Sequence, residues 1–163
     1  MKATEILIRE HELILRGIRV LEAMARLANN STPVPADDAR AIIEFIRTFA
    51  DGCHHAKEEK HLFVMLQQRG MPSGSGPVAV MLAEHEMGCK LIRAIAEALP
   101  NAKAGKAHAV TTVRDNLKAY VELLRNHIQK EENVLFPMAD RILSAEDQRT
   151  LATAFEKVEA EEM

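Results

Sequence analysis

The sequence HHAKEEKHLFVM at residues 54–65 recurs as HIQKEENVLFPM at residues 127–138, 73 positions later. Both copies fit the pattern H-x-x-K-E-E-x-x-L-F-x-M. A Glu-His-Glu triplet precedes each copy, at residues 10–12 in the first half and at residues 84–86 in the second. The triplet histidine and the first motif histidine are 43 residues apart in the first half and 42 in the second. The chain therefore reads as two copies of one helical hairpin.

Apolar residues recur at three- and four-residue spacing, which is the period of an amphipathic helix. Four long segments show this period, at roughly residues 4–28, 36–69, 77–99 and 107–140. Stretches rich in proline, glycine and asparagine separate them, at residues 29–35, 70–77 and 100–105. Because short loops join antiparallel neighbours, we expect an all-α fold, an up-down-up-down four-helix bundle.

A shorter fifth helix is predicted after Ser144, whose hydroxyl can form a capping box with Asp147 three residues on. Its acidic end, residues 159–162, is predicted to be a frayed and solvated tail. We expect one bundle domain over residues 1–143, followed by a C-terminal helix and acidic tail over residues 144–163.

The composition bounds the class of protein. The 163 residues are 47% hydrophobic, which suffices for one domain with a real core. The 24 acidic and 21 basic side chains are mixed along the chain, so nothing indicates a nucleic-acid or anionic membrane partner. No apolar run approaches the roughly 20 residues that span a bilayer, and no signal peptide is apparent. Cys53 and Cys89 are too few for a disulfide framework, so we expect a cytoplasmic protein.

The histidines of the two copies fall at matching heights in the predicted helices. His11 and His54 both lie roughly 26 Å from the first loop, at 1.5 Å per residue. His85 and His127 match less closely, but within the uncertainty of helix ends assigned from sequence. Each of the four shares a helix face with apolar residues, so we expect all four imidazoles at one level of the bundle core.

Two carboxylates share that level. Glu58 and Glu131 lie four residues after His54 and His127, so each stacks one turn along the same inward stripe. Burying two carboxylates without a compensating positive charge costs several kcal/mol, and bound cations supply that charge. Two imidazoles per metal with two bridging carboxylates suit iron, with manganese or zinc as alternatives. The sequence predicts a dinuclear metal site with these donors: His11, His54, Glu58, His85, His127 and Glu131.

Other polar residues near the motif are assigned to solvent. We expect His55 and His108 to be solvated, and the runs at residues 57–60 and 130–132 to form exposed faces outside the inward stripe. The second glutamate of each motif is expected to turn away from the core, and neither motif lysine shares the stripe.

Two further side chains stay open, and a third has a simple interpretation. His61 lies seven residues after His54 and is a candidate ligand or proton shuttle. Tyr120 could line a cavity, although a core tyrosine with a satisfied hydroxyl is the simpler interpretation. Cys53 is expected to be a small buried hydrophobe.

These residues resemble the haemerythrin-like family, specifically the HHE cation-binding domains, over about residues 4–140. The strings that carry the resemblance are His54-x-x-x-Glu58, Glu84-His85-Glu86 and His127-x-x-x-Glu131 with VLFP at residues 134–137. The resemblance implies that the two histidines of the first half bind one iron, that those of the second half bind the other, and that the two glutamates bridge them. Such a site has room for an oxo or hydroxo bridge and an exogenous ligand.

The chain departs from the oxygen-carrying haemerythrins at two positions. Those proteins have a further histidine four residues after the one that matches His85, where this chain has Cys89, which stays open as a thiolate ligand. Their last carboxylate is an aspartate five residues after the histidine, where this chain has Glu131 after four. The site is more similar to the four-histidine, two-glutamate version of iron-sulfur cluster repair proteins and iron-sensing domains, so the resemblance does not imply simple oxygen carriage.

Three functions remain open. An open coordination position favours a non-haem diiron protein that binds or turns over dioxygen, nitric oxide or peroxide. The alternative is a protein that binds, senses or donates iron, including a role in iron-sulfur cluster repair. The third is a structural bundle with core histidines. We favour the first; the motif leaves open whether the chain is an enzyme and indicates no cofactor beyond the metal.

Overall fold

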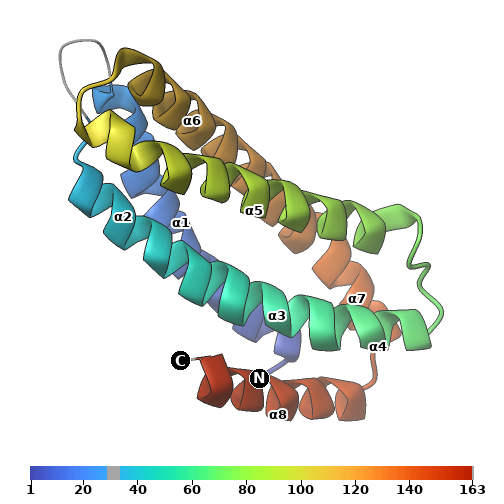
Figure 1. Ribbon diagram of the computed structural model, residues 1–163. Helices are drawn as coiled ribbons and strands as arrows, with labels where there is room; N and C mark the ends of the chain where they lie inside the picture. The colour runs from blue at the N-terminus through green and yellow to red at the C-terminus, as the bar shows by residue number, and fades with distance from the viewer. Residues whose placement is uncertain (29–33, 163) are drawn as a thin grey trace.

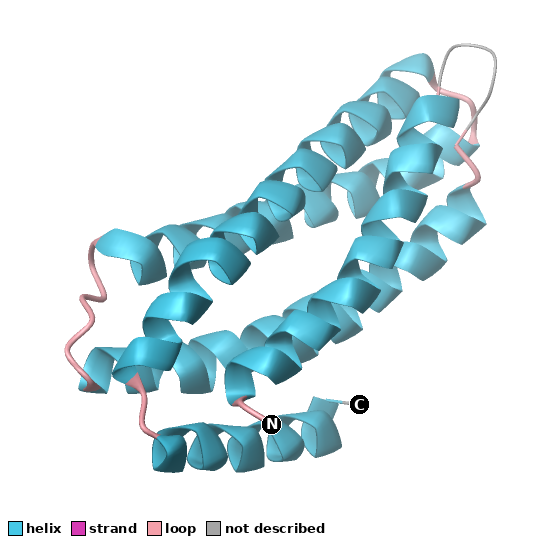
Figure 2. Cartoon of the chain, turned by 180° about the vertical axis from the view of Figure 1, so that it is seen from behind, coloured by secondary structure: helices cyan, strands magenta, loops and turns pink. Residues whose placement is uncertain are grey.

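The computed structural model describes residues 1–28 and 34–162. Every regular element in these residues is a helix, which confirms the predicted all-α fold (Figure 2). The helices are α1 (Ala3–Leu27), then α2 (Ala36–Phe45), η1 (Ile46–His54), α3 (His55–Lys57), η2 (Glu58–Leu62) and α4 (Phe63–Gln68), then α5 (Gly76–Lys103), then α6 (Ala107–Lys130), η3 (Glu131–Leu135) and α7 (Phe136–Ile142), and finally α8 (Ala145–Glu162).

The bundle consists of four long helices that alternate in direction (Figure 1). α2 to α4 form one continuous helix with η1 and η2, and α6, η3 and α7 form another. α6 packs against both α1 and α5, and α2 packs against the same two helices. α8 lies outside this bundle and contacts α1 and the middle of the second helix, at η1, α3 and η2. The predicted haemerythrin-like bundle with an added C-terminal helix is therefore what the chain forms.

The loops follow the predicted breaks with one difference. The first predicted loop, at residues 29–35, falls mostly outside the described residues. The third break is wrong at Pro100, because α5 continues through it and ends at Lys103. The helix ends instead where Gly105 takes a φ of +82°, a left-handed conformation that favours glycine. The amide of Lys106 then donates to the carbonyl of Asn101 at 3.1 Å, which closes the last turn.

The predicted cap of the fifth helix is confirmed. The Asp147 amide donates to the Ser144 hydroxyl at 3.0 Å, and the Ser144 amide donates to the Asp147 carboxylate at 3.1 Å. The acidic end differs from the predicted frayed tail, because α8 stays helical to Glu162 and Glu159 contacts a buried lysine of the bundle.

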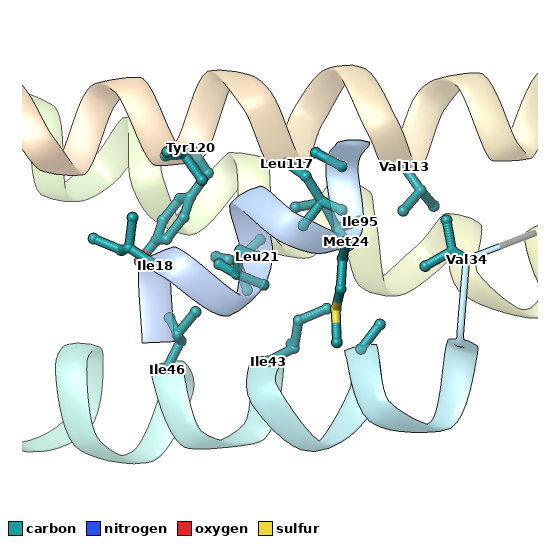
Figure 3. Packing of buried hydrophobic residues seen from close by; sticks show 14 of the residues in the cluster. Ile18, Leu21, Met24, Val34, Ile43, Ile46, Ile95, Val113, Leu117 and Tyr120 are labelled. Carbon is teal, nitrogen blue, oxygen red and sulfur yellow. The ribbon is translucent and has the colours of Figure 1, made fainter. Parts of the chain in front are cut away.

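Two apolar clusters fill the bundle above and below a polar layer. The first cluster includes Ile18, Leu21, Ile43, Ile95 and Leu117 (Figure 3). The second includes Leu7, Phe63, Met81, Phe136 and Phe155. On α1, Leu7 belongs to the second cluster and Ile14 to the first, and His11 lies between them. The same order holds on the other three helices, so the predicted donors form one layer between the two clusters.

Three π-helical segments lie at or next to this layer. The second helix has π-helical turns at Ile46–His54 and Glu58–Leu62, and the fourth has one at Glu131–Leu135. All three turns adjoin or contain predicted metal donors. Single π-helical turns inside α-helices occur frequently at functional sites, because the extra residue per turn changes which side chains face inward.

Candidate metal centre

The six predicted donors converge in the polar layer. Each is at most 5% exposed. They come from all four long helices: α1 supplies one histidine, the second helix a histidine and a glutamate, α5 one histidine, and the fourth helix a histidine and a glutamate. The structure therefore brings together every side chain of the predicted set: His11, His54, Glu58, His85, His127 and Glu131.

Glu58 joins the two halves of the chain. Its Oε1 lies 2.9 Å from Nε2 of His54, and its Oε2 lies 3.1 Å from Nε2 of His85. Since the two imidazoles belong to different copies of the motif, the carboxylate spans the two halves as a bridging ligand does.

Glu131 occupies the equivalent position in the second copy. Its Oε1 lies 3.2 Å from Nε2 of His11 and 3.2 Å from Nε2 of His127. The Nε2 atoms of His85 and His127 are themselves 3.1 Å apart. All four imidazoles thus turn the same ring nitrogen toward the centre of the layer.

Several of these fully buried inward atoms form no well-aligned hydrogen bond within the described residues, because their close contacts are mainly with one another. They are Nε2 of His11 and of His54 and both carboxylate oxygens of Glu58 and of Glu131. Buried carboxylates are otherwise almost always hydrogen-bonded or paired with a cation. Converging imidazole nitrogens and buried carboxylate oxygens fit metal ions, which need deprotonated nitrogen and oxygen donors.

The side chains able to hold a metal form two groups, which together contain all six donors and also His55, and in each group the ligand atoms lie within 4.8 Å of one another. One group is His11, His54, Glu58 and Glu131, and the other is His55, Glu58, His85 and His127. The first contains the predicted histidine pair of the first half, and the second contains that of the second half. Glu58 belongs to both groups, as expected for a bridging carboxylate.

Four carboxylates form an outer ring around the imidazoles. The sequence analysis did not predict this ring. Each contacts the Nδ1 atom of one donor histidine: Glu10 with His54 at 3.0 Å, Glu84 with His127 at 3.0 Å, Glu59 with His85 at 3.4 Å and Glu132 with His11 at 3.2 Å. A carboxylate at Nδ1 fixes the ring orientation and the tautomer that leaves Nε2 free for a metal.

The sequence carried a signal for this ring. Glu10 and Glu84 are the first residues of the two Glu-His-Glu triplets, and Glu59 and Glu132 are the second glutamates of the two motifs. The expectation that the latter two turn away is correct for the centre of the layer. However, both glutamates contact an imidazole from the other half of the chain, which was not predicted.

The two motif lysines support this ring. Lys57 donates to Glu10 and Lys130 donates to Glu84, each to the carboxylate oxygen that does not contact histidine. Lys57 was expected on an exposed face and is instead 0% exposed, because α8 covers it and Glu159 accepts a second hydrogen bond from it at 2.7 Å. Lys130 has no such cover and is 43% exposed.

Charge within the layer shifts the pKa values of the metal-free protein. Burial opposes protonation of His54, but the Glu58 and Glu10 carboxylates outweigh it and raise its pKa to about 10. His85 is likewise opposed by burial and raised by Glu58 and Glu59, to a pKa of about 9. Burial alone would raise the pKa of Glu58, yet the adjacent His54 and His85 hold it well below its usual value. The layer thus favours ionised carboxylates balanced by positive charge.

His55 is a residue whose environment the sequence did not predict. It was expected in solvent and is 5% exposed, with its ring stacked on His85 at 3.8 Å between centroids. Its Nδ1 lies 3.2 Å from the Asp51 carboxylate. Burial, together with the charge of His85, lowers its pKa to about 4. The cause is α5, which packs His85 against the side of the second helix that carries His55.

The remaining candidates lie outside the donor set. His61 is partly buried and belongs to neither metal-capable group within the described residues. Cys89 is exposed and likewise belongs to neither group, and Cys53 is buried as expected. Tyr120 is 1% exposed, but its hydroxyl has no hydrogen-bond partner in the described part of the chain, contrary to expectation.

An antiparallel four-helix bundle with a central layer of histidines and glutamates defines a class of metal-binding bundle proteins. A model of the hemerythrin HHE cation binding domain matches residues 2–139. The chain belongs to this family, as its motifs predict. None of the described helices is both long enough and apolar enough to cross a membrane.

Three curated relatives illustrate the range of similar proteins. An uncharacterized protein of Mycobacterium tuberculosis is 30% identical over 159 residues, which cover 96% of this chain and 61% of that protein. The iron-sulfur cluster repair protein YtfE of Cronobacter sakazakii is 36% identical over 89 residues, 53% of this chain and 40% of that protein. YtfE of Salmonella newport is 29% identical over 132 residues, 78% of this chain and 56% of that protein. The chain therefore spans only about three fifths of these relatives at most.

Proposed function

We propose that this chain is a non-haem diiron protein that binds or reacts with a small ligand, namely dioxygen, nitric oxide or peroxide. His11 and His54 hold one iron, His85 and His127 hold the other, and the two glutamates of the layer bridge them. The observation that carries the proposal is the convergence of four imidazole Nε2 atoms on the fully buried carboxylates of Glu58 and Glu131. Two irons with open coordination positions supply redox chemistry to such a ligand.

The chain's own residues prepare this site. The outer carboxylates orient the four imidazoles, and the two apolar clusters exclude bulk water above and below the layer. With two imidazoles and two shared carboxylates for each iron, the protein leaves coordination positions for a small molecule.

Two measurements test the proposal. Elemental analysis of the purified chain is expected to give two irons per chain, and a chain free of metal contradicts the proposal. Stopped-flow mixing of the reduced, iron-loaded protein with dioxygen, nitric oxide or hydrogen peroxide is expected to change its optical spectrum. No spectral change with any of the three contradicts the reaction with small ligands while leaving metal binding intact.

A second function, in which the chain binds, senses or donates iron, is favoured by the similarity to iron-sulfur cluster repair proteins. Its test is the transfer of iron from the loaded chain to an iron-free iron-sulfur protein. The control is the same amount of free ferrous iron. Transfer no faster than from free iron contradicts a donor role.

A further inference from the structure

A polar pocket opens onto one side of the metal centre. It has a volume of about 300 Å³ and lies between the second helix and α5. It reaches His85, one of the six donors, whereas His11 and His54 are not among its lining residues. The lining residues are Asp51, His55, Glu59, Leu82, His85, Glu86 and Cys89. We call this space the entry pocket.

The internal repeat shows that three of the polar residues in this lining have aliphatic equivalents, whereas Glu59, His85 and Glu86 correspond to Glu132, His11 and Glu12. The positions equivalent to Asp51 and His55, 73 residues further on, are Leu124 and Ile128. Both are buried, at 3% and 4% exposure, within the first apolar cluster. The second copy of the motif therefore has aliphatic side chains where the first copy has a carboxylate and an imidazole.

A third polar residue without a polar equivalent lies on α5, the helix that faces Asp51 and His55 across the pocket. Cys89 of α5 is exposed at the entry pocket, and the equivalent position on α1 is Leu15, which packs against the first apolar cluster. Three polar residues thus lie with His85 in the lining of the entry pocket, and the three equivalent positions are occupied by aliphatic residues. The two halves of the centre have the same kinds of donor, but the residues beside these donors differ in polarity at three positions.

His55 connects the entry pocket to the donor layer. A ring nitrogen of His55 lies within 4.8 Å of the ligand atoms of Glu58, His85 and His127. Its Nδ1 faces Asp51, so the carboxylate holds the ring beside His85. A ligand at a metal bound by His85 and His127 is therefore within reach of a hydrogen bond from this imidazole.

The charge of the pocket limits the ligand class. Asp51, Glu59 and Glu86 place three carboxylates around it and Lys or Arg line none of it. An anion entering this space is repelled by like charges, whereas a neutral molecule is not. Dioxygen, nitric oxide and hydrogen peroxide are neutral, and the volume suffices for each.

We propose that the entry pocket is the binding site for the small neutral ligand, which reaches the metal held by His85 and His127 and accepts a hydrogen bond from His55. This inference rests on the proposed function, because it requires metal at the centre. It goes further in making the two metals unequal: the one held by His11 and His54 has no part in ligand binding.

The first test compares matched variants from the two halves. Protein loaded with iron is reduced without oxygen and titrated with nitric oxide, and the optical spectrum gives the affinity. His55→Ile is expected to retain two irons and to bind nitric oxide roughly tenfold more weakly, since one hydrogen bond is lost. Ile128→Val, at the equivalent position, is expected to leave the affinity unchanged.

The second test needs no substitution in the centre. N-ethylmaleimide is expected to label the exposed Cys89 but not Cys53, which is 1% exposed. The bulky adduct is expected to slow nitric oxide association several-fold. In the Cys89→Ser protein, the same treatment is expected to leave the nitric oxide association rate equal to that of the untreated variant.

The outcomes separate this inference from the proposed function. Unchanged affinity in His55→Ile, or unchanged association after labelling, overturns the inference while two bound irons uphold the metal centre. Loss of iron in His55→Ile also overturns it, because His55 is then a metal ligand. Absence of iron in the wild-type protein overturns the proposed function and this inference with it.

Discussion

Lys57 donates a hydrogen bond to Glu159, 2.7 Å away, and so attaches helix α8 to the layer that contains the candidate metal centre. The same ammonium group contacts Glu10, whose other oxygen contacts His54. A continuous chain of polar contacts therefore runs from the C-terminal helix to a predicted metal donor. Because Lys57 is fully buried, its charge depends on these two carboxylates.

Replacing Lys57 by methionine is expected to destabilise the metal-free protein by about 3 kcal/mol, since a buried carboxylate then loses its cation. The repeat provides a matched control. Lys130→Met removes the equivalent contact with Glu84 at a 43% exposed site and is expected to cost less than about 1 kcal/mol. Urea unfolding followed by circular dichroism measures both. Equal losses would show that cover by α8 does not matter.

Replacing Glu58 or Glu131 by alanine is expected to lower the metal content more than replacing His61 does. Glu58 and Glu131 each contact two donor imidazoles, whereas His61 belongs to neither metal-capable group. Elemental analysis of the purified variants gives the metal content per chain. The reverse ranking would mean that the ligands are wrongly assigned.

Metal is expected to raise the melting temperature. Only the folded bundle presents the converging donors, so free metal at about 100 times its dissociation constant stabilises the fold by about 2.7 kcal/mol. Thermal unfolding with and without a chelator measures the shift. An identical melting temperature in both conditions would show that no metal binds in this layer.

The metal-free protein is expected to lose stability as the pH rises from about 7 to about 10. The pKa values of His54 and His85 are raised to about 10 and about 9, so the folded state binds more protons than the unfolded state above pH 6.5. The stability that these protons contribute is fully present when the pH is below the pKa of unfolded histidine. It is lost as the pH rises through the pKa values of the folded state. His55 has a lowered pKa and acts only at lower pH. Unfolding free energies that rise over this range would contradict the charge balance of the layer.

Tyr120→Phe is expected to leave the stability unchanged or to raise it by up to about 1 kcal/mol. The hydroxyl is buried without a hydrogen-bond partner in the described residues, and removing an unsatisfied polar atom relieves its desolvation cost. Urea unfolding of the two proteins provides the comparison. A loss larger than about 1 kcal/mol would reveal a partner for the hydroxyl.

The repeat predicted the bundle and the convergence of its six donors, because helical period and matched spacing depend only on local sequence. Lys57 could not be predicted in the same way. Its burial follows from the docking of α8, a tertiary contact between residues 102 positions apart. His55 is buried by the packing of α5, and its neighbour His54 lies within a π-helical segment that a regular 3.6-residue period does not describe.

The break at Pro100 shows the limit for helix ends. Proline near the end of an amphipathic segment predicts a stop, yet α5 continues three residues past Pro100 to Lys103, and the positive φ follows at Gly105. The C-terminal end of this helix is thus determined by the residue that can close its last turn.

Glu58 and Glu131 each contact one imidazole from the first half of the chain and one from the second, so the centre needs both halves. A lone hairpin, residues 1–69 or 76–142, would have two of the four donor histidines and one of the two donor glutamates but would lack one of the imidazoles that its carboxylate contacts. A polypeptide with a single copy would have to associate with a second molecule to build the same centre. Covalent linkage of the two copies makes assembly of the centre independent of protein concentration.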